Sequence, residues 1–147
     1  MVSNKRNFNT EGIILKRRNY GEADRIVVIY TKHLGKISCL AKGVRRPNSR
    51  KRASIELFSQ IKTGGVLHSG INLITETVIV NSHPVLRNDL TRVNAAYQVC
   101  EILDRLTVDG SETVGVYPLT VECLNTIEKT SFNLLDQTVE VFTGSFW

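Results

Sequence analysis

The sequence predicts an α+β protein in which a small β barrel or sandwich precedes a set of helices. Before residue 81, five short stretches rich in β-branched residues alternate with turn residues, as in a small all-β module. From Pro84 onward the apolar residues recur at steps of three or four, which is the spacing of one helix face. We therefore expect a β domain over residues 1–80 and a helical domain over residues 81–147.

Turn residues separate the five expected strands from one another. The strands are expected at residues 12–16, 25–31, 36–44, 55–62 and 71–80. The turn signals are Asn19-Tyr20-Gly21, Leu34-Gly35, Pro47-Asn48-Ser49, Gly64-Gly65 and Ser69-Gly70. Short strands at such even spacing fit a small barrel or a sandwich.

The helical domain begins with one long apolar stripe. Its members are Leu86, Leu90, Val93, Tyr97, Cys100, Leu103 and Leu106. Pro84 suits a first helical turn, Asn88 is the expected N-cap of a helix beginning at Asp89, and Gly110 is the expected stop. A second helix is expected from near Pro118, and the apolar pattern partly recurs from Phe132. These helices need the barrel surface to bury their stripes.

Charge is divided unevenly between the two domains. Residues 1–80 contain 15 basic and five acidic residues, a net charge of +10, whereas residues 81–147 contain four basic and nine acidic residues, a net charge of −5. A basic patch creates a field that attracts phosphates. The division therefore indicates a polyanion-binding part joined to a part with another task.

Several protein classes conflict with the sequence. The longest apolar stretches, such as residues 25–30, are far shorter than the roughly 20 residues of a membrane span. The basic start has no apolar segment after it, which favours a cytoplasmic protein. Cys39, Cys100 and Cys123 form no C-x-x-C pair, so we expect neither disulfides nor zinc, and each is expected to be a buried apolar residue.

The strongest functional signal is a basic segment that contains no acidic residue. Its basic residues are Lys36, Lys42, Arg45, Arg46, Arg50, Lys51 and Arg52. Lys36 and Lys42 share parity on the expected third strand, so both are expected on one face, which the following loop extends. Arginine forks match phosphate oxygens in pairs, so the segment is a candidate nucleic-acid-binding site. The alternative is a solvated loop that serves only solubility.

Tyr20 is the one aromatic residue that we expect to be exposed in the β domain, because it adjoins the turn glycine Gly21. Bases of single strands stack on exposed rings, so Tyr20 is a possible base-stacking residue. Tyr30 and Phe58 are expected in the core or in turns instead.

Four segments of the β domain resemble the RecO family of bacterial DNA repair proteins in residues, order and spacing. They are residues 10–15 (TEGIIL), 20–27 (YGEADRIV), 31–32 with 34–37 (TK and LGKI) and 41–47 (AKGVRRP). Further similar pieces are residues 56–58 (ELF), 75–76 (TE), 86–90 (LRNDL) and 103–106 (LDRL). The resemblance covers nearly all of residues 8–107 and weakens beyond them.

This resemblance implies a five-stranded OB-fold followed by an incomplete helical domain, in a recombination mediator without catalytic machinery. Family members bind single- and double-stranded DNA, anneal complementary strands, contact the acidic tail of single-strand-binding protein, and work with RecR to load RecA. A cytoplasmic, nucleoid-associated protein is therefore expected. The basic segment would hold the DNA backbone with little sequence preference.

The chain departs from the family at its C-terminal end. Many relatives continue into a four-cysteine zinc module, whereas this chain ends before any such motif, so we expect no metal or other cofactor. A naturally short form and a fragment of a longer protein both agree with this. In the helical domain, Arg87, Arg92 and Arg105 are the possible partner-binding residues.

Three other functions compete with this interpretation. His33, His68, His83 and Cys39 could form a hydrolase or nuclease centre, but no motif with catalytic or metal-ligand spacing accompanies them. A general RNA- or DNA-binding OB module is a second alternative, because backbone electrostatics do not distinguish the two polymers. The third is a protein adapter that docks through its helical stripe.

Overall fold

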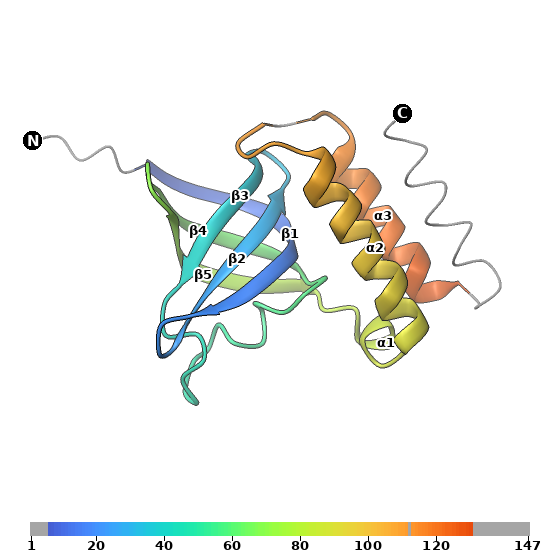
Figure 1. Ribbon diagram of the computed structural model, residues 1–147, viewed down its shortest axis with the longest axis horizontal. Helices are drawn as coiled ribbons and strands as arrows, with labels where there is room; N and C mark the ends of the chain where they lie inside the picture. Colours follow the sequence, from blue (N-terminus) through green and yellow to red (C-terminus); the bar gives the residue numbers. More distant parts are fainter. Residues whose placement is uncertain (1–5, 112, 131–147) are drawn as a thin grey trace, which may run out of the picture.

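The computed structural model describes residues 6–111 and 113–130, which form five strands followed by three helices (Figure 1). The elements are β1 (Arg6–Tyr20), β2 (Asp24–Thr31), β3 (Gly35–Ala41), β4 (Gln60–Leu67), β5 (Asn72–Asn81), α1 (Pro84–Arg87), α2 (Leu90–Leu106) and α3 (Val116–Lys129). The predicted α+β class is confirmed. None of these described helices combines the length and apolarity needed to cross a membrane.

The five strands close into a barrel in the order β1-β2-β3-β5-β4. All neighbours are antiparallel except β3 and β5, which run parallel and pair only at Cys39↔Asn72 and Leu40↔Leu73. Strand β1 is long enough to pair with β4 through its first half and with β2 through its second half. This closed five-stranded barrel is the predicted OB-fold.

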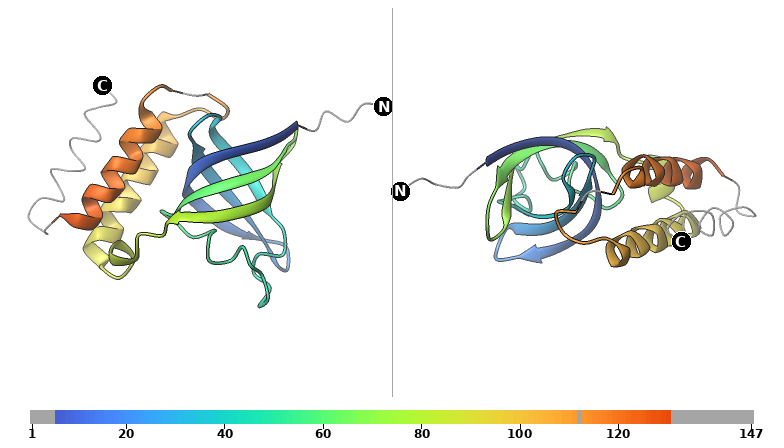
Figure 2. Two further views of the ribbon diagram at one scale, coloured as in Figure 1. Left: turned by 180° about the vertical axis from the view of Figure 1, so that it is seen from behind. Right: turned by 90° about the horizontal axis from the view of Figure 1, so that it is seen from above.

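Two apolar cores meet at β1. Ile14, Val27 and Ile29 point into the barrel, whereas Ile13 and Leu15 point outward and pack with the helices. Alternate residues of a strand face opposite sides, so one strand serves both cores. Figure 2 shows the helices lying along one side of the barrel. Cys39 lies in the barrel core, while Cys100 and Cys123 lie between the barrel and the helices, so all three are buried as predicted.

The predicted fourth strand is wrong in its position. Residues 55–59 form turns and a short irregular stretch, and β4 begins only at Gln60. Gly64 and Gly65 lie inside β4 rather than in a turn. A Cβ atom on Gly65 would lie 2.0 Å from the carbonyl oxygen of Leu73, so glycine is needed where β4 and β5 approach closely.

The predicted helical stripe is divided between two helices. Helix α1 ends at Arg87, and Asp89 rather than Asn88 caps α2, since its carboxylate accepts the backbone N–H of Thr91 at 3.0 Å. Helix α2 ends at Leu106, before the expected stop at Gly110. Helix α3 begins at Val116, close to the expected start, and the pattern expected from Phe132 lies outside the described residues.

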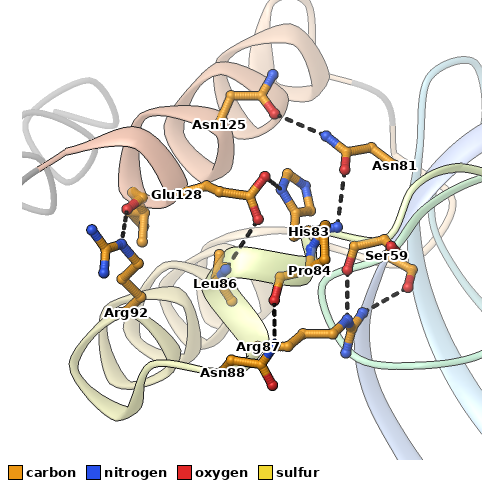
Figure 3. Close-up of polar contacts among 12 residues, drawn as sticks. Ser59, Asn81, His83, Pro84, Leu86, Arg87, Asn88, Arg92, Asn125 and Glu128 are labelled. Atoms are coloured by element: carbon orange, nitrogen blue, oxygen red, sulfur yellow. Dashed lines mark hydrogen bonds and ion pairs between the residues drawn. The ribbon is translucent and has the colours of Figure 1, made fainter.

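A buried polar network joins the barrel to the helices (Figure 3). The carboxylate of Glu128 on α3 accepts the backbone N–H of Leu86 at 3.0 Å and lies 3.5 Å from Nδ1 of His83. Arg87 donates to the carbonyl oxygens of Ser82 and Leu57 and to Oγ of Ser59. The single turn of α1 is thus held between α3 and the segment that precedes β4.

The stability of this junction is expected to fall on mild acidification. Burial lowers the pKa of His83, and Glu128 offsets this only partly. The folded state therefore binds fewer protons than the unfolded state, so stability is complete above about pH 6.5 and decreases as the pH falls below it. Thermal melting between pH 8 and pH 5 checks this: a His83→Gln variant should lose less Tm below pH 6.5 than the parent, and parallel curves would contradict the assignment.

Candidate nucleic-acid interface

The basic loop, defined here as residues 45–53, is suspended between two buried apolar anchors. Val44 before it and Ile55 after it are both fully buried in the barrel core. Between them the chain folds into successive turns, closed by backbone hydrogen bonds from Arg46 to Gly43, from Ser49 to Arg46 and from Ser54 to Lys51. Burial of the anchors holds the ends of the loop, so its centre projects from the barrel (Figures 1 and 2).

The loop is attached to the turn between β1 and β2. Oδ1 of Asp24 accepts the backbone N–H of Gly43 at 2.7 Å, and the backbone N–H of Arg45 donates to Ala23 at 2.9 Å. Gly43 has φ +66, a left-handed conformation that glycine adopts without strain. Asp24 therefore has a structural role, because it joins the start of the loop to this turn.

The guanidinium group of Arg45 donates hydrogen bonds to backbone carbonyl oxygens of the protein. Its Nε donates to the carbonyl oxygen of Asp24 at 3.0 Å, and its Nη2 donates to the carbonyl oxygen of Gly21 at 2.7 Å. Arg45 thereby fastens the basic loop to the β1–β2 turn. The structure therefore shows a positioning role for Arg45, and its expected phosphate contact stays a prediction.

Five other basic residues of the segment differ from Arg45 in the use of their charged groups. Within residues 6–111 and 113–130, no ion pair or hydrogen bond involves their charged groups. They are Lys42, Arg46, Arg50, Lys51 and Arg52. Lys51 is half-buried and the other four are exposed. The charge of this surface is therefore available to an external polyanion.

Lys36 is buried and does not lie with these five cations on the exposed surface. Strand β3 ends at Ala41, before Lys42, and the Lys36 side chain is only 10% exposed. Its ammonium donates to the carbonyl oxygens of Asp104 at 2.7 Å and Thr107 at 2.9 Å and to Oδ1 of Asp104 at 3.2 Å. Lys36 therefore caps the C-terminal end of α2 and joins it to the barrel.

The carboxylate of Asp104 balances this buried lysine. Burial alone raises the pKa of Asp104, but hydrogen bonds from Lys16 and Lys36 bring it below its ordinary value. Lys16 lies 2.7 Å from Oδ2 of Asp104. Two strands thus contribute a cation each to one helical carboxylate.

Tyr20 is the last residue of β1, and it is 51% exposed. Its carbonyl oxygen accepts from Nη2 of Arg45 at 3.4 Å, so the ring lies at the same end of the barrel as the basic loop. A base-stacking role for Tyr20 remains a prediction.

The three arginines expected to bind partners differ in their availability. The guanidinium group of Arg87 donates hydrogen bonds within the junction between the barrel and the helices. Arg92 pairs with Asp89 and donates to the carbonyl oxygens of Ile127 and Thr130 at the end of α3. Arg105 is 75% exposed and forms an ion pair with Glu101 along α2. Only Arg105 of these three presents its side chain fully to solvent.

The residues of a hypothetical catalytic centre are dispersed. His33 and His68 are exposed in separate turns, whereas His83 is buried at the junction. Cys39 lies in the barrel core, where burial raises the pKa of its thiol to about 12. A thiol with this pKa is not a nucleophile at neutral pH.

Sequence reasoning missed the basic residues of β1 and β2. Arg17 and Arg25 both form ion pairs with Glu56, beside the basic loop. Lys16 and Arg18 border a groove of about 430 Å³ between this hairpin and α2. The bulge at Leu15 interrupts the strand alternation, so the sequence does not reveal which face each residue takes.

Comparison with known proteins agrees with this geometry. Residues 5–83 match the family model described as "Recombination protein O N terminal". A DNA repair protein RecO of Symbiobacterium thermophilum is 33% identical over 118 residues, covering 80% of this chain and 47% of that protein. The one of Heliobacterium modesticaldum is 38% identical over 114 residues, covering 76% of this chain and 41% of that protein.

A longer match is the DNA repair protein RecO of Acetivibrio thermocellus, which is 36% identical over 137 residues, covering 92% of this chain and 53% of that protein. The chain spans about half the length of these relatives or less. The family model covers more than half of the chain and coincides with its barrel. The chain therefore belongs to the RecO family.

Proposed function

We propose that this chain is a non-catalytic DNA-binding recombination mediator in DNA repair, and that it binds and anneals single-stranded DNA through its basic loop. The observation that carries this proposal is the set of five cations that have no partner within residues 6–111 and 113–130, at one end of the OB barrel. OB-folds commonly bind single strands in a positively charged groove. The names of the relatives support a role in DNA repair.

Annealing follows from the kind of contact that this surface offers. Lysine and arginine side chains neutralise backbone phosphates, which reduces the repulsion between two complementary strands. Phosphate contacts do not read sequence and leave the base edges free to pair. The exposed ring of Tyr20 would add stacking without sequence preference.

The wider role is proposed from the family resemblance. In that role the whole protein works with RecR to load RecA, contacts the acidic tail of single-strand-binding protein, and associates with the nucleoid in the bacterial cytoplasm. Of the three helical arginines, Arg105 is the best placed for an acidic partner, because its side chain is 75% exposed.

An annealing assay tests the proposal. Complementary oligonucleotides, one of them labelled, are mixed with the chain in the presence and absence of magnesium. The proposal predicts faster duplex formation and strands of unchanged length in both conditions. Shortened strands would instead indicate a nuclease, and no acceleration would contradict the annealing role. Equal binding of a matched RNA competitor would favour the general nucleic-acid-binding module.

A further inference from the structure

Beside the basic loop, two arginines lie on the inner face of the β1–β2 hairpin. The cross-strand pairs are Arg17 with Val27 and Asn19 with Arg25. Residues two apart in a strand share a face, so these four residues lie together. Val27 is fully buried in the barrel core, which identifies the shared face as the inner one. Arg17 and Arg25 therefore lie on the inner side of the barrel wall and face the segment that contains the basic loop.

Glu56 lies between the two guanidinium groups. Its Oε2 is 3.3 Å from Nη2 of Arg17, and its Oε1 is 3.5 Å from Nη1 of Arg25. Each oxygen thus serves a different arginine. The carboxylate bridges the pair in the way that the oxygens of one phosphate would.

Arg25 is incompletely satisfied by this arrangement. Its side chain is only 12% exposed, and its Nη1 is buried without a hydrogen-bond partner among residues 6–111 and 113–130. Its Nε donates to Oδ1 of Asn19 at 3.3 Å. A buried guanidinium nitrogen held only by a 3.5 Å ion pair would gain from a closer anion.

Positive charge exceeds negative charge around Glu56. Burial lowers the pKa of Arg25 first, the charge of Arg17 lowers it further, and Arg52 and Arg45 add to this, whereas Glu56 raises it. The carboxylate of Glu56 therefore lies in the positive field of several guanidinium groups. This excess of positive charge favours the binding of an external anion.

We propose that Arg17 and Arg25 form a subsite for one nucleic-acid phosphate, and that Glu56 occupies this subsite in the absence of nucleic acid. The inference rests on the proposed function and deepens it. A phosphodiester and a carboxylate each carry one negative charge, so the exchange replaces one anion by another. Glu56 therefore opposes binding and sets how much free energy the strand must supply.

A pair of substitutions at Glu56 tests this inference. Binding of a fluorescent oligothymidine is measured by anisotropy for the parent and for Glu56→Gln, and affinity is expected to rise about threefold to tenfold. The slope of log Kd against log salt should change little, because the same phosphate enters the subsite in both proteins. Tm should fall in the same variant, because the two ion pairs to Glu56 are lost.

The matched control is Glu22→Gln, which removes the same charge from the adjacent β1–β2 turn. Glu22 is exposed and has no ion pair within the described part of the chain, so its variant should change affinity much less. Glu56→Asp keeps the net charge but shortens the reach to both arginines, and it should also raise affinity. Equal effects of Glu56→Gln and Glu22→Gln, or no gain with Glu56→Asp, would overturn the inference.

The same series separates this inference from the proposed function. If the parent binds the oligonucleotide and loses affinity when the basic loop is neutralised, the proposed function stands whatever Glu56 does. If the parent does not bind at all, the proposed function fails and the subsite fails with it. Melting curves of all variants ensure that only folded proteins are compared.

Discussion

Replacing Arg46, Arg50 and Arg52 together by alanine is expected to weaken binding to a single-stranded oligonucleotide by at least about tenfold at moderate salt. All three side chains are exposed and form no ion pair or hydrogen bond within the described part of the chain. Their loss removes phosphate contacts without disturbing a packed group, so Tm should change little. Fluorescence anisotropy and thermal melting measure the two quantities.

The matched control removes the same number of charges from other parts of the surface. Lys32, Lys62 and Lys129 are exposed and lie on the β2–β3 turn, on β4 and at the end of α3. A variant with these three replaced by alanine should retain most of the affinity. Equal weakening in the two variants would mean that net charge alone, and not the basic loop, attracts the strand.

Replacing Lys36 by methionine is expected to lower the free energy of unfolding by about 2–3 kcal/mol. Methionine keeps an apolar stem of similar length but leaves the carbonyl oxygens of Asp104 and Thr107 without their donor. For a chain of this size, that loss corresponds to a decrease in Tm of about 5–10 °C. Denaturant titration gives the free energy directly.

Lys62→Met is the control for this stability effect, because Lys62 is exposed on a neighbouring strand. Its free energy of unfolding should stay within about 0.5 kcal/mol of that of the parent. If Lys36→Met were as stable as Lys62→Met, the contact between Lys36 and the end of α2 would not hold the helices to the barrel.

Much of the fold follows from local patterns in the sequence. Alternation located β2 and β3 closely, and helical spacing located α2 and α3. The fourth strand was misplaced because Ile55 and Phe58 resemble strand residues, although they anchor a segment of turns. Gly64 and Gly65 resemble a turn, although they permit a close approach between strands. Tertiary packing decides both cases.

The sequence predicts the positive charge of the candidate site, but it does not predict which basic residues pair with other groups inside the protein. The basic loop is visible because its residues are consecutive in the sequence. The role of Lys36 was hidden because its partner Asp104 lies 68 residues away along the chain. The phosphate-binding arrangement proposed for Arg17 and Arg25 was hidden as well, because both face Glu56 from separate strands.

The central claim is that the cations of the basic surface exchange counterions for DNA phosphates. The direct measurement is the dependence of Kd for a single-stranded oligonucleotide on salt concentration. With five phosphates neutralised, the parent should show a slope of log affinity against log salt of about −3.5; with two, the variant lacking Arg46, Arg50 and Arg52 should show about −1.4. Parallel slopes for the two proteins would contradict the account.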